Sequence, residues 1–446
     1  MTRCFTHVTS KLPLHIAGQI SEFGQGKAPR HIVLKPNWVL HETDPAFPIR
    51  ALVTDARIID AVIAACLEAF PTVESILIGD CPLQSADWPL MCRQSGLDRV
   101  IDKYSAEQRV RFRDLRKHAY KVTGTGTETF LEESTDEHGD PRGYREVELG
   151  PRSHLEPISH QSKKFAVNDY SAAVTSSNHQ AGSHRYLVSQ SILDADLVIN
   201  LPKWKSHQKS GITCALKNLV GINGDKAYLP HFRRGAPKWG GDEYRDENRW
   251  LYWAQTTLRE RFQKRSRFAY RLLKPGWELL KRLRGIETRM TTTQATPSKE
   301  FYIAGGAWWG NDTIWRMIFD LNLIIRCVDS AGQLHDTPQR DYFCIVDGLV
   351  SGEGNGPLQP LPRDTDWLVC GEDPFAIDAA LSWFMGFDPL KLPIIAQRAH
   401  FAGPGWGGFD LAGLTVEVDG QLQRLLESPL NFKFSPPPGW RNHIER

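Results

Sequence analysis

The sequence lacks the cysteine spacing of zinc and iron–sulfur proteins. It has eight cysteines in 446 residues, and no two of them form a C-x-x-C pair. Sites of these kinds need closely spaced cysteine ligands, so we expect no iron–sulfur cluster. Several of the cysteines lie in apolar runs, where free cysteine acts as a small core residue.

Long hydrophobic runs are also missing. No stretch reaches the roughly 18 apolar residues of a membrane-spanning helix, and the first residues, MTRCFTHVTSKLP, contain no apolar core of a secretory signal. Neither sign of charge dominates, because 54 Lys and Arg stand against 52 Asp and Glu. The overall charge therefore gives no general attraction to nucleic acid. We expect a cytoplasmic protein with no specific nucleic-acid partner, and the sequence predicts no oligomeric state.

Strands and helices alternate in the first quarter of the chain, which predicts an α/β fold. A strand begins at His31, an amphipathic helix spans residues 55–70, and a buried strand runs through residues 75–79. This order is typical of a parallel sheet. We expect a mainly parallel sheet with helices on both faces. Its strand ends should meet at one cleft, and they lie at residues 35–37, 79–82, 201–211, 347–357 and 370–373.

The length exceeds what one hydrophobic core usually supports, so we divide the chain into five segments. They are an N-terminal α/β half (1–102), a polar insertion or flap (103–180), a central strand and helix (181–224), a basic helical insertion (225–300) and a C-terminal α/β half (301–446). In the last segment, residues 321–328 and 342–347 resemble strands. The glycine-rich residues 348–357 predict a loop that can approach a ligand closely.

The basic insertion is expected to form an arm of its own. From Arg259 to Arg284, ten Lys and Arg residues stand against Glu260 and Glu278, with aromatic and leucine residues between them. Such an arm contacts an anionic membrane surface, touches nucleic acid, or packs its apolar stripe on the body of the protein. We favour packing on the body, with contact to the inner membrane next.

The chain is organised around residues 195–223, where a buried strand leads into basic residues. Asp196–Asn200 has the pattern of a strand covered on both faces. Beyond it, an extended chain places the side chains of Lys203, Lys205 and His207 on one side.

A helix is expected to follow these residues. Ser210 would cap it, Gly211 would open it, and it would run from Ile212 to Val220 and stop at Gly221. A helix start carries partial positive charge. Crowded positive groups repel one another unless an anion binds, so this segment predicts an anion site.

These residues define a candidate active site for a small anionic ligand. His207 would act as general acid and base, because its ordinary pKa lies near neutrality, and Lys217 and Lys203 complete the catalytic set. The substrate-binding residues are Lys35, Asn37, Lys205, Ser210, Gly211, Asn218 and Asn355. The carboxylates that would orient the bases or bind a metal are Asp80, Asp347, Glu353 and Asp378.

Three of the acidic residues sit at informative positions. Asp80 follows a strand and either binds a ligand or caps the next helix. Asp373 precedes Pro374 and is expected to cap a helix. Asp378 lies inside that otherwise apolar helix, and because a buried carboxylate needs a partner, we expect it to contact a lysine of the 203–217 segment.

The segment PKWKSHQKSGITCALKNLVG resembles the hallmark of the family called domain of unknown function 362. That hallmark is P-K-x-K-[ST]-H followed by T-G-x-[TS]-x-x-x-K-N-L-x-G, and here Ser210 replaces the threonine. Further agreement lies at residues 35–37, 79–80, 346–348, 353–357, 373–378 and 386–389. The resemblance implies the same core fold but no agreed activity. Many members resemble iron–sulfur proteins because a ferredoxin module follows the core, and the cysteines of this chain cannot supply one.

The same segment is distantly similar to the lactate racemase family. There a histidine, a small residue with glycine, and a downstream lysine handle a nickel-pincer nucleotide and a 2-hydroxy acid. Only His207, Ser210, Gly211 and Lys217 correspond, and the other histidines of that family have no clear counterparts here. The resemblance admits a nickel-pincer nucleotide, and no residue pattern otherwise identifies a cofactor.

Two functions follow from these features. The first is an enzyme with oxidoreductase-like or racemase- and isomerase-like chemistry on a small anionic or hydroxylated substrate. The second is a non-catalytic ligand-binding protein that docks to an anionic membrane through the Arg259–Arg284 arm.

Overall fold

The computed structural model describes residues 4–7, 11–123, 130–134, 137–245 and 305–446. The predicted basic arm, Arg259–Arg284, lies outside the described residues. Within them, no helix is both long and apolar enough to cross a membrane.

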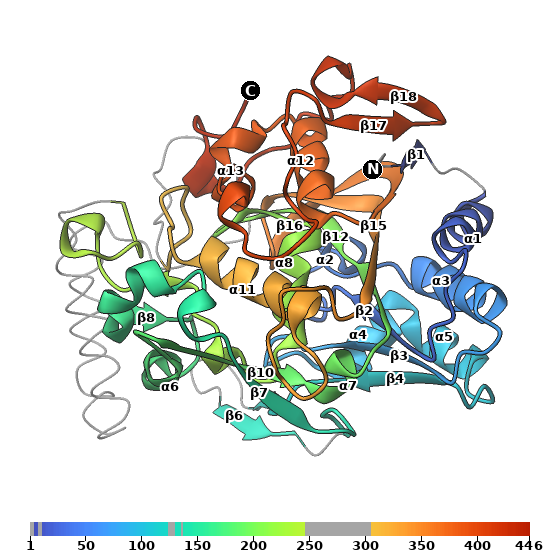
Figure 1. The fold of residues 1–446 in the computed structure, drawn as a ribbon, viewed down its shortest axis with the longest axis horizontal. Helices are drawn as coiled ribbons and strands as arrows, with labels where there is room; N and C mark the ends of the chain where they lie inside the picture. Colours follow the sequence, from blue (N-terminus) through green and yellow to red (C-terminus); the bar gives the residue numbers. More distant parts are fainter. Residues whose placement is uncertain (1–3, 8–10, 124–129, 135–136, 246–304) are drawn as a thin grey trace.

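A mixed eleven-stranded sheet forms the centre of the described structure (Figure 1). Neighbouring strands run parallel in the order β15–β11–β2–β3–β4, and β12 also pairs parallel with β15. Antiparallel pairing joins β15 to β16 and β16 to β1, and β1 continues parallel to β17. The strands are β1 (Cys4–His7), β2 (His31–Pro36), β3 (Ser75–Asp80), β4 (Val110–Asp114), β11 (Leu197–Leu201), β12 (Lys203–His207), β13 (Gly211–Thr213), β15 (Asp341–Asn355), β16 (Gln359–Gly371), β17 (Thr415–Val418) and β18 (Gln421–Arg424). The predicted mainly parallel α/β sheet is confirmed.

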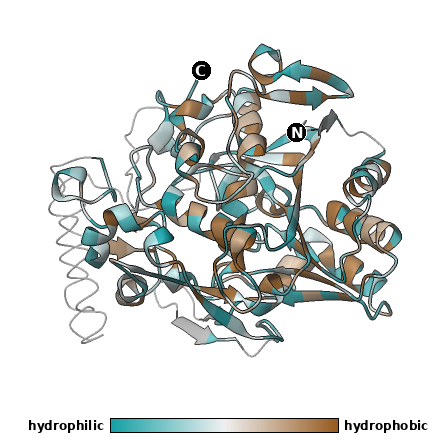
Figure 2. Cartoon of the chain, viewed as in Figure 1, coloured by the Kyte–Doolittle hydropathy of each residue, from teal (hydrophilic) through white to brown (hydrophobic). Residues whose placement is uncertain are grey.

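Helices cover both faces of this sheet, because alternate side chains of each strand point to opposite sides. On β2, Val33 joins one core, while Ile32 and Leu34 join the other. The first core contains α8 (Ala215–Asn218), α11 (Ile314–Cys327), α12 (Pro374–Met385) and α13 (Pro393–Ala396); the second contains α1 (Leu12–Phe23), α2 (Ile49–Leu52), α3 (Ala56–Ala69), α4 (Trp88–Ser95) and α5 (Leu97–Lys103). Figure 2 shows hydrophobic residues concentrated on the central strands and their flanking helices.

Smaller elements surround the main sheet. Within residues 103–180, β4 is a strand of the main sheet, so that sheet continues past the predicted boundary at residue 102. A second sheet has the order β7–β10–β9, and two-stranded sheets pair β14 with β8 and β5 with β6. The bounds are β5 (Tyr120–Thr123), β6 (Phe130–Glu133), β7 (Tyr144–Glu148), β8 (Phe165–Ala166), α6 (Ala172–Asn178), β9 (His179–Gln180), β10 (Ser183–Ser189), α7 (Gln190–Leu193) and β14 (Phe232–Arg233).

Two predicted elements of the C-terminal segment are wrong. Residues 321–328, predicted as a strand, form the second half of helix α11 and its end. A short apolar run does not distinguish a buried strand from a buried helix. The glycine-rich residues 348–357, predicted as a loop, mostly continue strand β15, which pairs with β16 as far as Asn355 and Gln359.

The predicted helix from Ile212 to Val220 is also wrong. Residues 203–213 form a β-hairpin in which His207 pairs with Gly211, and Gly211 adopts a left-handed φ of 82°. The hydroxyl of Ser210 donates a hydrogen bond to the Ile212 carbonyl instead of capping a helix. Because Ile212 and Thr213 are β-branched, they favour the strand, and α8 is confined to Ala215–Asn218.

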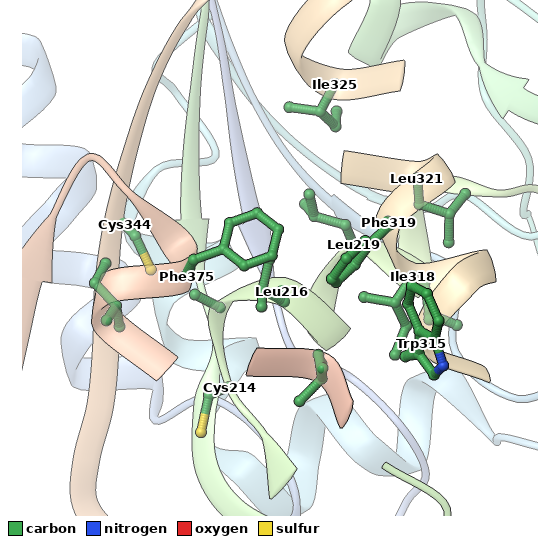
Figure 3. Close-up of a cluster of buried hydrophobic side chains, with 14 of the residues drawn as sticks. Cys214, Leu216, Leu219, Trp315, Ile318, Phe319, Leu321, Ile325, Cys344 and Phe375 are labelled. Atoms are coloured by element: carbon green, nitrogen blue, oxygen red, sulfur yellow. The ribbon is translucent and has the colours of Figure 1, made fainter. Parts of the chain in front are cut away.

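A side chain of helix α12 binds the start of helix α8. The carboxylate of Asp378 accepts hydrogen bonds from the backbone amides of Ala215 (2.7 Å) and Leu216 (3.1 Å). The prediction of a lysine partner is therefore wrong, although the bonded amides do lie within the predicted 203–217 segment. Figure 3 shows Leu216 beside Phe375, within a hydrophobic cluster of buried side chains. Asp373 caps α12 as predicted, accepting hydrogen bonds from Phe375 and Ala376.

Candidate functional site

A cavity of about 910 Å³ lies at the carboxyl ends of the parallel strands β2 and β3. Its wall is completed by the β12–β13 hairpin, helix α8 and residues 226–234. The ends of parallel strands are the usual ligand position in an open α/β sheet, and this volume suits a small ligand. Six of the predicted site residues line it: Asn37, Asp80, Lys205, His207, Lys217 and Asn218.

Lys35 and Asp80 form a buried ion pair at the floor of the cavity. The Lys35 ammonium lies 2.8 Å from the Asp80 carboxylate, and neither side chain is more than 4% exposed. Asp80 also accepts hydrogen bonds from the backbone amides of Trp38 and Cys81. It therefore does not cap the next helix, whose N-cap is Asp87.

The tight packing around this pair gives a testable prediction at Gly221. A Cβ atom added at Gly221 would lie 1.8 Å from an Asp80 oxygen and 2.7 Å from the Lys35 nitrogen. We expect Gly221→Ala to lower the free energy of unfolding by about 1–3 kcal/mol, because the buried pair must move.

The matched control is Gly18→Ala in helix α1, where nothing lies within 4 Å of the added methyl group. There we expect a gain of about 0.5–1 kcal/mol, because alanine loses less backbone entropy in a helix than glycine does. Urea denaturation measures both changes, and equal effects at the two glycines would contradict the packing explanation.

Asn218 fixes helix α8 to the strand ends. Its side-chain amide donates to the carbonyls of Lys35 and Pro36 and to the Asn200 side chain, and its oxygen accepts from Asn37 at 2.9 Å. These bonds occupy the polar atoms of Asn218. In contrast, the Asn37 oxygen and the Thr213 hydroxyl, both on residues that line the cavity, are buried and have no hydrogen-bond partner among the described residues.

Lys203 and Asp347 form a second buried ion pair, with a separation of 2.7 Å and exposures of 1% and 0%. Neither residue lines the cavity. Asp347 also accepts a hydrogen bond from the backbone amide of Asp55, which is the N-cap of α3. Burial raises the pKa of Asp347, while the Lys203 ammonium opposes this rise. The pair therefore locks strand β12 to β15 and to the start of α3.

Three further lysines line the cavity, and each donates a hydrogen bond to an oxygen. Lys205 donates to the Leu52 carbonyl, Lys226 to the Cys81 carbonyl and Lys209 to the Asn168 side chain. Burial lowers the pKa of all three, that of Lys209 to about 8. The Lys209 ammonium also lies 5.0 Å above the ring of Phe232.

Lys217 differs from these lysines because, within the described chain, it has no hydrogen-bond or ion-pair partner. It lines the cavity and is 9% exposed. Burial first, and then the ammonium groups of Lys226, Lys209 and Lys35, lower the pKa of Lys217 to about 7. Near neutral pH the cavity therefore contains an amine that is partly uncharged and unbound.

The two histidines that line the cavity differ in which ring nitrogen carries the hydrogen. Nδ1 of His207 accepts hydrogen bonds from the backbone amides of Lys209 (3.0 Å) and Ser210 (3.3 Å), so Nε2 carries the hydrogen. His231 lies 2.8 Å from the Leu229 carbonyl through Nδ1, which must donate, so its Nε2 has a free electron pair. Burial, together with nearby lysines, lowers the pKa of both rings well below the usual value.

These contacts show whether His207 could bind a metal ion, including the nickel of a pincer cofactor. Because Nδ1 of His207 accepts two amide hydrogens, Nε2 is a donor and offers no electron pair to a metal. The described residues contain no group of three or more His, Cys, Asp or Glu side chains placed to hold a metal ion. His207 therefore does not fit the role of a nickel ligand in this arrangement.

The remaining predicted residues do not line the cavity. Gly211 packs against Leu392 and Trp440. Glu353 pairs with Arg363 at 3.0 Å, and Asn355 accepts a hydrogen bond from Gln208. Residues 347–355 and 370–373 also do not line the cavity.

Sequence reasoning missed Lys209, Lys226 and His231, all of which line the cavity. Lys209 lies inside the basic segment and is separated from His207 by a single residue. In an extended chain this spacing places both side chains on the same side, so the sequence could have predicted Lys209 as a site residue. Lys226 and His231 were assigned to the basic insertion, although they precede the arm.

The fold and the cavity define an α/β protein with a lysine-lined cavity at the carboxyl ends of its parallel strands. A family model, domain of unknown function (DUF362), matches residues 142–382. The chain belongs to the DUF362 family. The resemblance to lactate racemases is not among these findings and stays a prediction.

Two individual proteins are similar to parts of the chain. A 54-residue stretch, 12% of this chain and 17% of the relative, is 35% identical to a thylakoid-associated protein of Synechocystis sp.. The crystal structure of a protein from Thermotoga maritima aligns with this chain at 11% identity and a TM-score of 0.34. The alignment covers 79% of this chain and 53% of the Thermotoga chain. That structural likeness is too low to support an inference. The chain thus spans much less than the full length of either protein.

Proposed function

We propose that the protein is an enzyme that binds a small anionic, hydroxylated substrate in the lysine-rich cavity. The observation that carries this proposal is the arrangement of Lys217 among Lys209, Lys226 and Lys35, with no carboxylate of the described residues bound to its ammonium group. Crowded cations in a buried site are stabilised when a negative ligand enters.

The polar groups of the cavity suit the parts of such a substrate. The Nε2 hydrogen of His207 and the Lys217 ammonium would bind anionic oxygens, and the unpartnered oxygen of Asn37 would accept a hydrogen bond from a hydroxyl group. The free electron pair of His231 and the partly neutral amine of Lys217 would accept protons. These groups support the racemase- and isomerase-like reading, in which a proton is moved.

Lactate and inorganic phosphate are suitable probes of the binding step. At pH 6, where Lys217 is charged, we expect Lys217→Gln to weaken the binding of either anion about ten- to a hundredfold, because a charged hydrogen bond is worth roughly 1.5–3 kcal/mol. Isothermal titration calorimetry measures the affinity.

The control is Lys11→Gln, at an exposed lysine before helix α1. Its affinities should equal those of the wild type. If neither anion binds the wild-type protein, or if Lys217→Gln binds as tightly, the cavity is not an anion site.

A second candidate is a ligand-binding protein that docks to an anionic membrane surface. It rests on the ten Lys and Arg residues of Arg259–Arg284 and on the similarity to the Synechocystis protein, which is thylakoid-associated. We expect the full chain to co-sediment with vesicles of anionic lipid, and a chain lacking residues 259–284 to stay in the supernatant. Vesicles of neutral lipid are the control. Equal sedimentation of both chains would remove this candidate.

A further inference from the structure

We infer that Lys217 forms a covalent imine with its ligand, and that the ligand is therefore a small anion carrying an aldehyde or ketone group. This inference rests on the proposed function of the cavity. Its basis is geometric: in the described structure Lys217 is a lysine of the cavity wall whose nitrogen is bound to no protein atom.

The other lysines in and around the cavity all have a bonded nitrogen. Lys35 and Lys203 are bound to carboxylates, and Lys205, Lys209 and Lys226 are bound to carbonyl or amide oxygens. A nitrogen held by a carboxylate stays protonated and has no electron pair to donate. An amine that is desolvated and surrounded by other cations is the usual form of a nucleophilic lysine. Burial and the neighbouring ammonium groups lower the pKa of Lys217 to about 7, which supports the same role.

Two groups on the cavity wall are suited to assist the reaction. The Lys217 ammonium contributes to the lowered pKa of both His207 and His231, so both rings lie within its electrostatic reach. The Nε2 hydrogen of His207 would polarise the carbonyl oxygen of the ligand, and the free electron pair of His231 would take up the proton released by the amine. The remaining lysines of the wall would bind the anionic part of the ligand.

The step balances without an oxidant or a reductant. The Lys217 nitrogen donates its electron pair to the carbonyl carbon, and the electrons of the C=O double bond move to the oxygen. One N–H proton reaches this oxygen through His231, and a second proton from solvent lets it leave as water. The products are a protonated imine and one water. The positive imine then withdraws electrons from the neighbouring carbon, whose proton becomes acidic. This extends the proposed proton-transfer chemistry to a carbonyl substrate.

Borohydride trapping tests the inference with the full chain. Wild-type protein is incubated with pyruvate or with glyceraldehyde 3-phosphate and treated with sodium borohydride, and peptides are mapped by mass spectrometry. We expect one adduct at Lys217 whose mass equals the probe less one oxygen atom. Lys217→Arg should lose this adduct, while Lys11→Met should retain it.

Lactate binding separates this inference from the proposed function, because lactate has the carboxylate of pyruvate but no carbonyl group. If lactate or phosphate binds and neither carbonyl probe labels Lys217, the imine is overturned and anion binding stands. If no anion binds and no adduct forms, both fail. The far-UV circular dichroism spectrum of Lys217→Arg should match that of the wild type, which shows that the variant is folded. An adduct at exposed lysines alone, equal in wild type and Lys217→Arg, also overturns the imine.

Discussion

Asp347→Ala is expected to lower the free energy of unfolding by about 3–5 kcal/mol, the cost of leaving a buried charge without its partner. The Lys203 ammonium would remain 1% exposed and unpaired. The backbone amides of Asp55 and Leu349 would also lose their acceptor. Chemical denaturation followed by circular dichroism measures the change.

An exposed ion pair provides the matched control for this prediction. Arg30 and Glu74 lie 2.6 Å apart, but their side chains are 67% and 48% exposed. Glu74→Gln should therefore change stability by less than about 1 kcal/mol. A double variant, Lys203→Met with Asp347→Leu, should recover much of the loss, because an apolar pair can replace a buried ionic one. A loss at Asp347→Ala no larger than that at Glu74→Gln would show that the Lys203 charge escapes to solvent.

The alternation of strands and helices could be predicted from the sequence because it depends on local periodicity. The predicted helix at residues 55–70 is α3 (Ala56–Ala69), and the predicted strand at 75–79 is β3 (Ser75–Asp80). The strand Asp196–Asn200, predicted to be covered on both faces, is β11, and all five of its residues are buried. Each has a hydrophobic pattern that its neighbours in space do not override.

The hairpin at residues 203–213 could not be predicted because its stability is not local. Strand β12 is fixed by β15, through pairing and through the Lys203–Asp347 ion pair. The start of α8 is fixed by Asp378, which lies on another helix far along the chain. Ser210 and Gly211 are equally good residues for a helix start and for a tight turn, so the sequence pattern alone favoured the wrong choice.

Only part of the candidate site could be predicted, because the pairing of its charges also depends on contacts between distant parts of the chain. Basic residue types in one segment indicated an anion site, but spacing did not show which charges have internal partners. Lys203 and Lys217 look alike in the sequence, yet Lys203 is paired with Asp347, and Lys217 has no ion-pair partner in the part of the chain that the structure describes. That difference depends on which carboxylate the folded sheet brings near, and Asp347 belongs to a strand in the other half of the chain.

The second large effect is expected in the pH dependence of anion binding. Burial and neighbouring cations lower the pKa of Lys217 to about 7. Burial alone lowers the pKa of Lys209 to about 8, against the opposing effect of nearby carboxylates. An anion binds the protonated forms more tightly, so binding takes up protons above these pKa values, and affinity falls as pH rises. We expect lactate affinity to be flat below pH ~6 and to fall by up to about tenfold per pH unit above pH 7, since one pKa unit corresponds to about 1.4 kcal/mol. Lactate is suitable because it stays ionised throughout this range, whereas phosphate does not.

Two variants assign the two midpoints of this profile. Lys217→Gln should remove the decline centred near pH 7 and keep the one near pH 8, because Lys209 remains in the cavity. Lys209→Gln should remove the decline near pH 8 and move the other decline to higher pH, because the Lys209 ammonium no longer lowers the pKa of Lys217. Neither His207 nor His231 should contribute, because burial and the nearby lysines hold the pKa of both rings well below the usual value. If the wild-type profile is flat between pH 6 and 9, Lys217 keeps its charge throughout, and both its role as a titrating ligand group and its supply of a neutral amine are lost. A decline near pH 7 that survives in Lys217→Gln would instead place the titrating group elsewhere in the cavity wall.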